Sequence, residues 1–267
     1  MHITITGNLG SGKSTVAKLL SEKYGFEIYS TGKVQRELAR QMNMTTLELN
    51  QLMRSDKKYD KMIDDETSRI SRDNKEKDII FDSRLAWHFV ESSFKVFVSV
   101  SLDVAAMRVM NDTRGEEEKY TSFEEARRLL AERAATEKVR YKEIYDLNYM
   151  DFSNYDLIID STFCLPDKIA EVILTEARAY ENRQTNIAKL LISPKRIRLE
   201  EYSQEEEKLR LSSLIETYRK VPYAIDKVIK VKKLEDDYVA LEAFDDIKAA
   251  IYSEVSFIPV EVVNEIM

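Results

Sequence analysis

A short glycine-rich stretch near the start of the chain most strongly limits what this sequence can fold into. Residues 7–14 read GNLGSGKS, which matches the GxxxxGK[ST] pattern of a phosphate-binding loop. A β-branched run containing Ile3 and Ile5 precedes the loop, and apolar residues at helical spacing follow it from Lys13 to Tyr24. In that context, the backbone N–H groups of the loop and the helix N-terminus surround phosphate. The pattern therefore predicts that the chain binds a nucleoside triphosphate.

The residue types in the loop assign individual roles. Lys13 is expected to reach the β- and γ-phosphates, and the Ser14 hydroxyl to bind Mg²⁺. Asp82, at the end of an apolar strand, is expected to hold the same ion through a bound water; an aspartate that only caps the strand end is the plainer alternative. The triphosphate is expected to contact a continuous segment, namely Gly7, Asn8, Leu9, Gly10, Ser11, Gly12, Lys13, Ser14 and Thr15.

Charge and cysteine content narrow the class of protein. The formal net charge of the 267 residues is −7, which argues against a general binder of nucleic acid or of membrane surfaces. The single cysteine, Cys164, excludes an intramolecular disulfide and fits a reducing compartment. We therefore expect a cytoplasmic protein whose partners include small molecules.

Strand-like and helix-like segments alternate along the first two thirds of the chain. After the first strand and helix, apolar strands are predicted at 26–30, 78–83, 95–102 and 155–160, with helical sequence at 33–74, 104–145 and 166–179. This alternation predicts an α/β fold with a parallel sheet, helices on both faces and ligands at the carboxyl ends of the strands.

The last part of the chain differs in character. A polar joint at 181–186 leads into shorter strand-like and helix-like segments, including a helix near 204–219. We predict two domains, 1–186 and a small α/β domain at 187–267. Arg196 and Arg198 are expected on a solvated edge strand, with contact to a phosphate as the alternative.

Several arginines stand where phosphate ligands are needed. Transfer between two phosphorylated molecules requires more than one cation, because charge on the transferring group must be neutralised. Arg133 and Arg140 are seven residues apart and so share a helix face. The other candidates are Arg36, Arg84, Arg108 and Arg114. Each arginine alone fits an ordinary surface position, but their joint placement after strands favours phosphoryl transfer.

Residues 3–175 resemble the archaeal-type cytidylate kinases, members of the nucleoside monophosphate kinase group. The matching stretches are ITGNLGSGKSTVAKLL, YSTGKVQRELARQMNMTTLELNQLM, DSRLAWHF and ERAATEKVRYKEIYDLNYMDFSNYDLIID. The resemblance implies a P-loop NTPase three-layer sandwich with a helical insert that binds the monophosphate and a short lid. It also implies transfer from ATP, with Mg²⁺, to CMP or dCMP, giving CDP or dCDP.

The resemblance further implies roles by position. Ser30, Thr31 and Arg36 would line the acceptor site, and Arg84 would hold the acceptor phosphate. The lid and the phosphate clamp would contain Arg108, Arg114, Arg133 and Arg140. Arg133 and Arg140 match the family pattern better than the other two. The residues implied to be catalytic are Lys13, Arg84, Arg133 and Arg140.

Two departures keep other functions open. Lys33 stands where the family commonly has an aspartate, which reverses a charge close to the acceptor. The chain also extends beyond a simple monophosphate kinase, and residues 187–267 resemble ParB/sulfiredoxin-like domains without their nucleotide-handling motif. The alternatives are a P-loop kinase for another small metabolite, or a catalytically degenerate nucleotide-binding regulatory protein. The C-terminal domain would then act in regulation, bind a protein partner or form a homo-oligomer.

Overall fold

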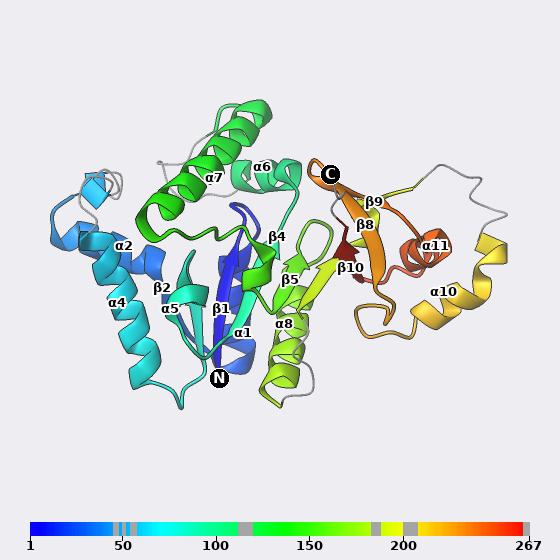
Figure 1. The fold of residues 1–267 in the computed structure, drawn as a ribbon, viewed down its shortest axis with the longest axis horizontal. Helices are drawn as coiled ribbons and strands as arrows, with labels where there is room; N and C mark the ends of the chain where they lie inside the picture. Colours follow the sequence, from blue (N-terminus) through cyan, green and yellow to red (C-terminus); the bar gives the residue numbers. More distant parts are fainter. Residues whose placement is uncertain are drawn as a thin grey trace.

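The computed structural model describes residues 1–44, 48–49, 52–53, 58–111, 120–182, 188–199 and 208–263, without the side chains of Lys33, Arg36 and Glu37. One mixed sheet runs through these residues (Figure 1) in the strand order β2-β3-β1-β4-β5-β6-β10-β8-β9-β7. The strands are β1 (His2–Gly7), β2 (Glu27–Ser30), β3 (Ile79–Asp82), β4 (Phe94–Ser99), β5 (Leu157–Asp160), β6 (Lys189–Ile192), β7 (Ile197–Arg198), β8 (Ile229–Leu234), β9 (Asp237–Ala240) and β10 (Ile258–Val262).

Helices cover the sheet and extend beyond its edges. Figure 1 shows α2 and α4 at one flank of the sheet, with α6 and α7 across the ends of the strands. The helices are α1 (Lys13–Tyr24), α2 (Thr31–Gln41), α4 (Lys58–Asp73), α5 (Ala86–Phe89), α6 (Leu102–Met110), α7 (Phe123–Tyr145), α8 (Pro166–Glu181), α10 (Ser212–Tyr218) and α11 (Phe244–Tyr252), with short 3-10 turns η2 (Phe152–Asn154) and η3 (Pro194–Arg196). Within the described residues, no helix is long and apolar enough to cross a membrane.

The N-terminal part has the predicted α/β architecture. The strands from β2 to β6 in the sheet order pair in parallel. All residues of β1, β3 and β5 are buried, because α1 and α8 pack on one face of the sheet and α5 with the segment around η2 packs on the other. This double covering explains the continuous apolar runs in the sequence.

The local boundaries follow from residue types. The helix predicted from Lys13 to Tyr24 has those bounds, and it ends because Gly25 adopts a left-handed conformation with φ 81°. The helical sequence predicted at 33–74 contains α2 and α4, and that at 104–145 contains α6 and α7. Both spans include residues that lie outside the described part of the chain, and the predicted helix near 204–219 is described as α10.

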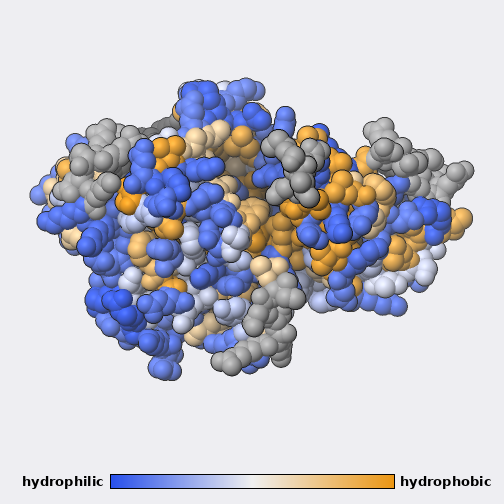
Figure 2. Space-filling model, viewed as in Figure 1, coloured by the Kyte–Doolittle hydropathy of each residue, from blue (hydrophilic) through white to orange (hydrophobic). Residues whose placement is uncertain are grey.

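The C-terminal part continues the same sheet. β6 pairs in parallel with β5, and β10 pairs antiparallel to β6. α10 and α11 bury a separate apolar core against β8, β9 and β10. Figure 2 shows hydrophobic residues gathered where the two parts of the molecule meet, whereas hydrophilic residues cover most of the N-terminal part. The domain boundary at 186/187 remains a prediction, and the sheet crosses it.

One expectation for this part was wrong. Strand β7 is an edge strand and Arg198 is 57% exposed, but the Arg196 side chain is only 4% exposed. The 3-10 turn η3 places Arg196 beside Asp160, which is fully buried at the end of β5. An ion pair with a residue 36 positions earlier in the chain therefore replaces the expected solvation.

Candidate active site

The phosphate loop joins β1 to α1 at the carboxyl end of the sheet. A side chain at Gly7 would bring its Cβ to 2.3 Å from the carbonyl oxygen of Val98, so only glycine fits against β4 there. Gly10 adopts φ 73°, and a Cβ there would lie 2.9 Å from Ala105 of α6. The backbone N–H of Asn8 donates to Val98 at 3.1 Å. The loop is therefore held between β4 and α6.

The predicted metal-binding pair lies together at the start of α1. The Ser14 hydroxyl donates to Oδ2 of Asp82 at 2.9 Å. Asp82 is buried at the end of β3, and its Oδ1 has no hydrogen-bond partner among the described residues. Two hard oxygen donors with an unused carboxylate oxygen fit Mg²⁺, which typically takes one or two protein oxygens plus phosphate and water. Lys13 is half-buried at the first position of the same helix.

Arg84 directly contacts the phosphate loop. Its Nη1 donates to the carbonyl oxygen of Gly7 at 2.6 Å, and its Nε donates to Oε2 of Glu137 at 2.9 Å. Glu137 also accepts from Nε of Arg133 at 3.3 Å. The structure thus brings Arg84 and Arg133 together across one carboxylate, which the sequence analysis missed.

The charges of this trio are mutually stabilised. Burial alone would raise the pKa of Glu137, but Arg84 and Arg133 outweigh it and lower that pKa. Burial alone would lower the pKa of Arg84, but the Glu137 carboxylate outweighs it and raises that pKa. Arg84 and Glu137 are therefore both ionised at neutral pH.

A second polar group joins α4 to α7. Nη2 of Arg140 pairs with Oδ1 of Asp60 at 2.5 Å, and the Tyr145 hydroxyl donates to Asp64. Oδ2 of Asp60 is buried and has no hydrogen-bond partner among the described residues. Burial raises the pKa of Asp64 to about 7, although the hydrogen bond from Tyr145 opposes the shift.

The sequence contained one signal for these residues. Asp60 and Asp64 are four apart and therefore lie on one face of α4. That face meets the α7 residues Arg140 and Tyr145, so the two aspartates, the tyrosine and Glu137 join the candidate site.

The remaining predicted residues fall around the loop. Ser30 pairs in register with Asp82 across β2 and β3, and Thr31 follows it as the first residue of α2. Arg108 on α6 donates to Gly10 O at 3.4 Å and to Ser161 Oγ at 3.0 Å. Burial lowers the pKa of Arg108. The Arg36 side chain, the Lys33 side chain and the whole of Arg114 lie outside the described residues.

The arrangement suits transfer of a phosphoryl group without a protein nucleophile. Main-chain donors and the Ser14–Asp82 pair lie on the loop side, while arginines approach from the segment after β3 and from α7. Cations on both sides of a transferring phosphoryl group neutralise the charge that develops on it.

Comparison with known proteins agrees with this geometry. Residues 2–162 match the model of the cytidylate kinase-like family. The chain is 36% identical over 177 residues to the cytidylate kinase of Methanococcoides burtonii, which covers 65% of this chain and 97% of that protein. It is 38% identical over 184 residues to the cytidylate kinase of Natronomonas pharaonis (67% of this chain, 91% of that protein) and 34% over 178 residues to that of Sulfolobus acidocaldarius (65% and 92%).

Proposed function

Because this chain belongs to the cytidylate kinase-like family, we propose that it is a kinase that transfers the γ-phosphoryl group of ATP to CMP or dCMP. The observation that carries the proposal is the contact of Arg84 with the Gly7 carbonyl. This contact supports a role for a half-buried cation next to the loop that would hold the donor phosphates, where it could also reach an acceptor phosphate, as transfer between two phosphorylated molecules requires. The products are CDP or dCDP, together with ADP.

The phosphate loop provides the donor side. Residues from Gly7 to Thr15 hold the triphosphate of ATP, with Lys13 on its β- and γ-phosphates. Ser14 would bind Mg²⁺, and Asp82 would hold a water of the same ion. When bound, Mg²⁺ supplies positive charge that neutralises the phosphates.

The acceptor side lies between β3, α2, α4 and α7. Arg84 would bind the acceptor phosphate, and Ser30 and Thr31 would line the nucleoside site. Arg36 is assigned to the same site from the sequence alone. Oδ2 of Asp60, which has no hydrogen-bond partner in the described part of the chain, offers an acceptor for the exocyclic amino group of cytosine. Uracil presents a carbonyl oxygen at that position instead, which a carboxylate repels.

The remaining arginines act on the transferring group. Arg133 is half-exposed on α7 and can turn from Glu137 to the phosphates. Arg140, two turns further along the same face, extends the positive charge toward the acceptor. Closure of the proposed lid would exclude water, so that the γ-phosphoryl group passes to the nucleotide and ATP is not hydrolysed.

We further propose that the enzyme works in the cytoplasm and that residues 187–267 form a regulatory or interaction unit. The single cysteine supports a reducing compartment. The separate apolar core under α10 and α11 supports a distinct unit, whose fold is of the ParB/sulfiredoxin-like kind proposed from its sequence. A second copy of the chain or another protein is its expected partner.

The direct test is a coupled assay of ADP release with MgATP and a panel of acceptors. CMP and dCMP should support the fastest turnover, with UMP, AMP and non-nucleotide acceptors far slower. No stimulation by either cytidine nucleotide would reject the proposed acceptor. Stimulation by another acceptor alone would identify a different kinase on the same fold.

Lys13→Ala tests the role of the loop. Removing a positioned charge from the transferring phosphates should lower kcat by about 10²–10³-fold. The matched control is Lys18→Ala on the same helix, where the side chain is 70% exposed. Both variants should keep the thermal melting temperature of the wild type within a few degrees, measured by circular dichroism. Near-normal turnover in Lys13→Ala would reject the assigned role.

A further inference from the structure

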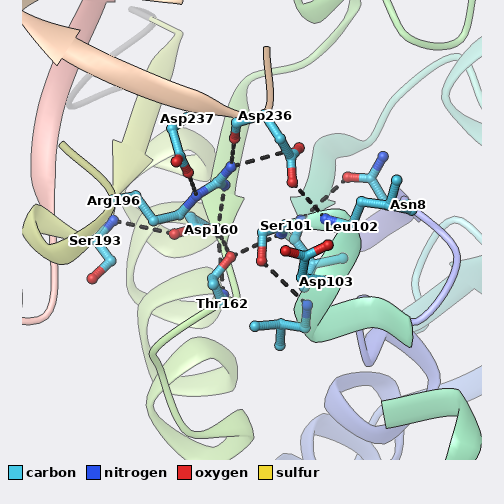
Figure 3. Close-up of polar contacts among 12 residues, drawn as sticks. Asn8, Ser101, Leu102, Asp103, Asp160, Thr162, Ser193, Arg196, Asp236 and Asp237 are labelled. Carbon is cyan, nitrogen blue, oxygen red and sulfur yellow. Dashed lines mark hydrogen bonds and ion pairs between the residues drawn. The ribbon is translucent and has the colours of Figure 1, made fainter. Parts of the chain in front are cut away.

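A group of charges around the buried ion pair of Arg196 and Asp160 joins the C-terminal part to the end of β5, close to the phosphate loop. We call Asp160, Arg196, Asp236 and Asp237 the Arg196 cluster (Figure 3). Nη1 of Arg196 donates to Oδ1 of Asp160 at 3.0 Å, and Nη2 donates to the carbonyl oxygen of Asp236. The guanidinium also lies 5.4 Å from the ring centre of Tyr238. Arg196 is therefore fixed between the two parts of the molecule.

On one side, the cluster orders the residues that follow β5. Oδ1 of Asp160 accepts from the Thr162 hydroxyl at 2.6 Å and from its backbone N–H at 3.3 Å. Oγ1 of Thr162 in turn accepts from the backbone N–H of Ser101 at 3.0 Å. Ser101 caps the N-terminus of α6, so Asp160 is linked to that helix through two hydrogen bonds and Arg196 through three.

On the other side, the cluster touches α6 directly. Asp236 lies in the turn between β8 and β9, and its Oδ2 accepts from the backbone N–H of Leu102 at 2.6 Å. Leu102 is the first residue of α6, where N–H groups lack partners within the helix. A carboxylate at this end is also favoured by the helix dipole.

Helix α6 forms one wall of the phosphate loop. Ala105 packs against Gly10 so closely that a Cβ on Gly10 would lie 2.9 Å from it. Arg108 donates to the carbonyl oxygen of Gly10 and to both oxygens of Ser161. The segment before α6 is also tied to the loop, because the Val100 N–H donates to Oδ1 of Asn8 at 3.2 Å. A shift of α6 would therefore displace the loop.

We propose that the C-terminal part is a positioning element for the donor nucleotide, acting through Arg196 and Asp236 on α6. Both residues are positioning residues, since they act on the phosphate loop through α6 and the residues after β5. The acceptor-side contacts of Asp60 and Asp64 run between α4 and α7 instead. Losing the cluster should therefore weaken binding of ATP more than binding of CMP. The inference rests on the proposed function only in taking ATP as the donor.

The test uses the full chain with Asp236→Ala and Arg196→Met. The matched control is Arg198→Met, because Arg198 lies two residues from Arg196 and pairs with Asp237 but is 57% exposed. The dissociation constants for MgATP and for CMP are measured separately by titration calorimetry. We expect MgATP to bind about 10-fold more weakly to both cluster variants, CMP to bind within about 2-fold of wild type, and Arg198→Met to match wild type in both.

A fallback and one further variant keep the result decisive. Arg196→Met leaves Asp160 buried without its cation and can destabilise the fold, whereas Asp236 is 52% exposed. If Arg196→Met fails to fold, Asp236→Ala decides. Asp236→Asn retains an oxygen that accepts from Leu102 and should recover most of the affinity for MgATP.

Equal affinity of Asp236→Ala and wild type for MgATP would overturn the inference, as would an equal loss of affinity for both nucleotides. A wild type that binds MgATP but does not phosphorylate CMP would contradict the proposed function alone. The ratio of MgATP dissociation constants would still decide the role of the cluster.

Discussion

Glu137 illustrates how single carboxylates hold the arginines of this site. It lies between Arg84 and Arg133, and the two cations keep its pKa low. Spacing along a helix was enough to place Arg133 and Arg140 on one face. The same reasoning passed over Glu137, because an acidic residue does not bind phosphate and its partner Arg84 is 53 residues away.

Asp64 should make stability depend on pH. Its pKa is about 7 in the folded chain and about 3.9 when unfolded, so the folded state binds the proton more tightly. The contribution of Asp64 to stability is therefore present below about pH 4 and is lost as the pH rises toward about 7. Asp64→Asn removes this loss, so its free energy of unfolding should fall less than that of wild type between pH 5 and pH 8.

Urea unfolding at the two pH values measures this difference. Asp73→Asn is the matched control, because Asp73 is an exposed aspartate on the same helix and does not contribute to the raised pKa of Asp64. It should show the pH dependence of the wild type. An identical pH dependence in Asp64→Asn and wild type would contradict the raised pKa.

At the scale of elements, α7 organises the acceptor-side residues from a well-capped N-terminus. Ser122 accepts from the Glu125 N–H at 3.1 Å, and Oε2 of Glu125 reaches back to the Thr121 N–H at 2.6 Å. This reciprocal pattern is typical of a helix start. It fixes the helix that carries Arg133, Glu137 and Arg140.

Ser122→Ala should lower the free energy of unfolding by about 1 kcal/mol, because loss of the cap leaves the Glu125 N–H without its partner. Chemical denaturation measures the change. Thr136→Ala is the control within α7: its hydroxyl bonds only the carbonyl oxygen of Glu132 on the exposed surface, and alanine favours a helix. A loss in Thr136→Ala equal to that in Ser122→Ala would show that the cap has no special role.

At the scale of the whole molecule, the sheet joins the two predicted domains. Leu191 of β6 is buried in the same core as residues of α1 and α8, although it lies beyond the predicted boundary. Ile192, the next residue, faces the C-terminal core. Neighbouring side chains of one strand thus serve different cores, and we expect the chain to unfold in a single cooperative transition.

Leu191→Ala should test that expectation. Removing a fully buried leucine side chain costs about 2–5 kcal/mol, and here the loss should shift the whole transition. Scanning calorimetry measures both the shift and the number of transitions. Leu209→Ala is the control, because Leu209 is 80% exposed and should leave the melting temperature unchanged. Two transitions, of which Leu191→Ala moves only one, would instead indicate independent domains.

The sequence by itself determined the features that depend on neighbouring residues. The loop from Gly7 to Ser14, the helix after it and the alternation of strands and helices all follow from local patterns and backbone preferences. Family resemblance added the reaction class, which the comparisons support.

Only the tertiary structure decided how distant charges meet. Arg196 is buried because β6 continues the sheet and η3 then turns back toward Asp160. Asp236 reaches Leu102 across 134 residues of sequence because the turn between β8 and β9 lies against α6. Such contacts depend on which elements become neighbours in space. A pattern in the sequence reports only on residues close together in the chain, and so it could not place the C-terminal part beside the phosphate loop.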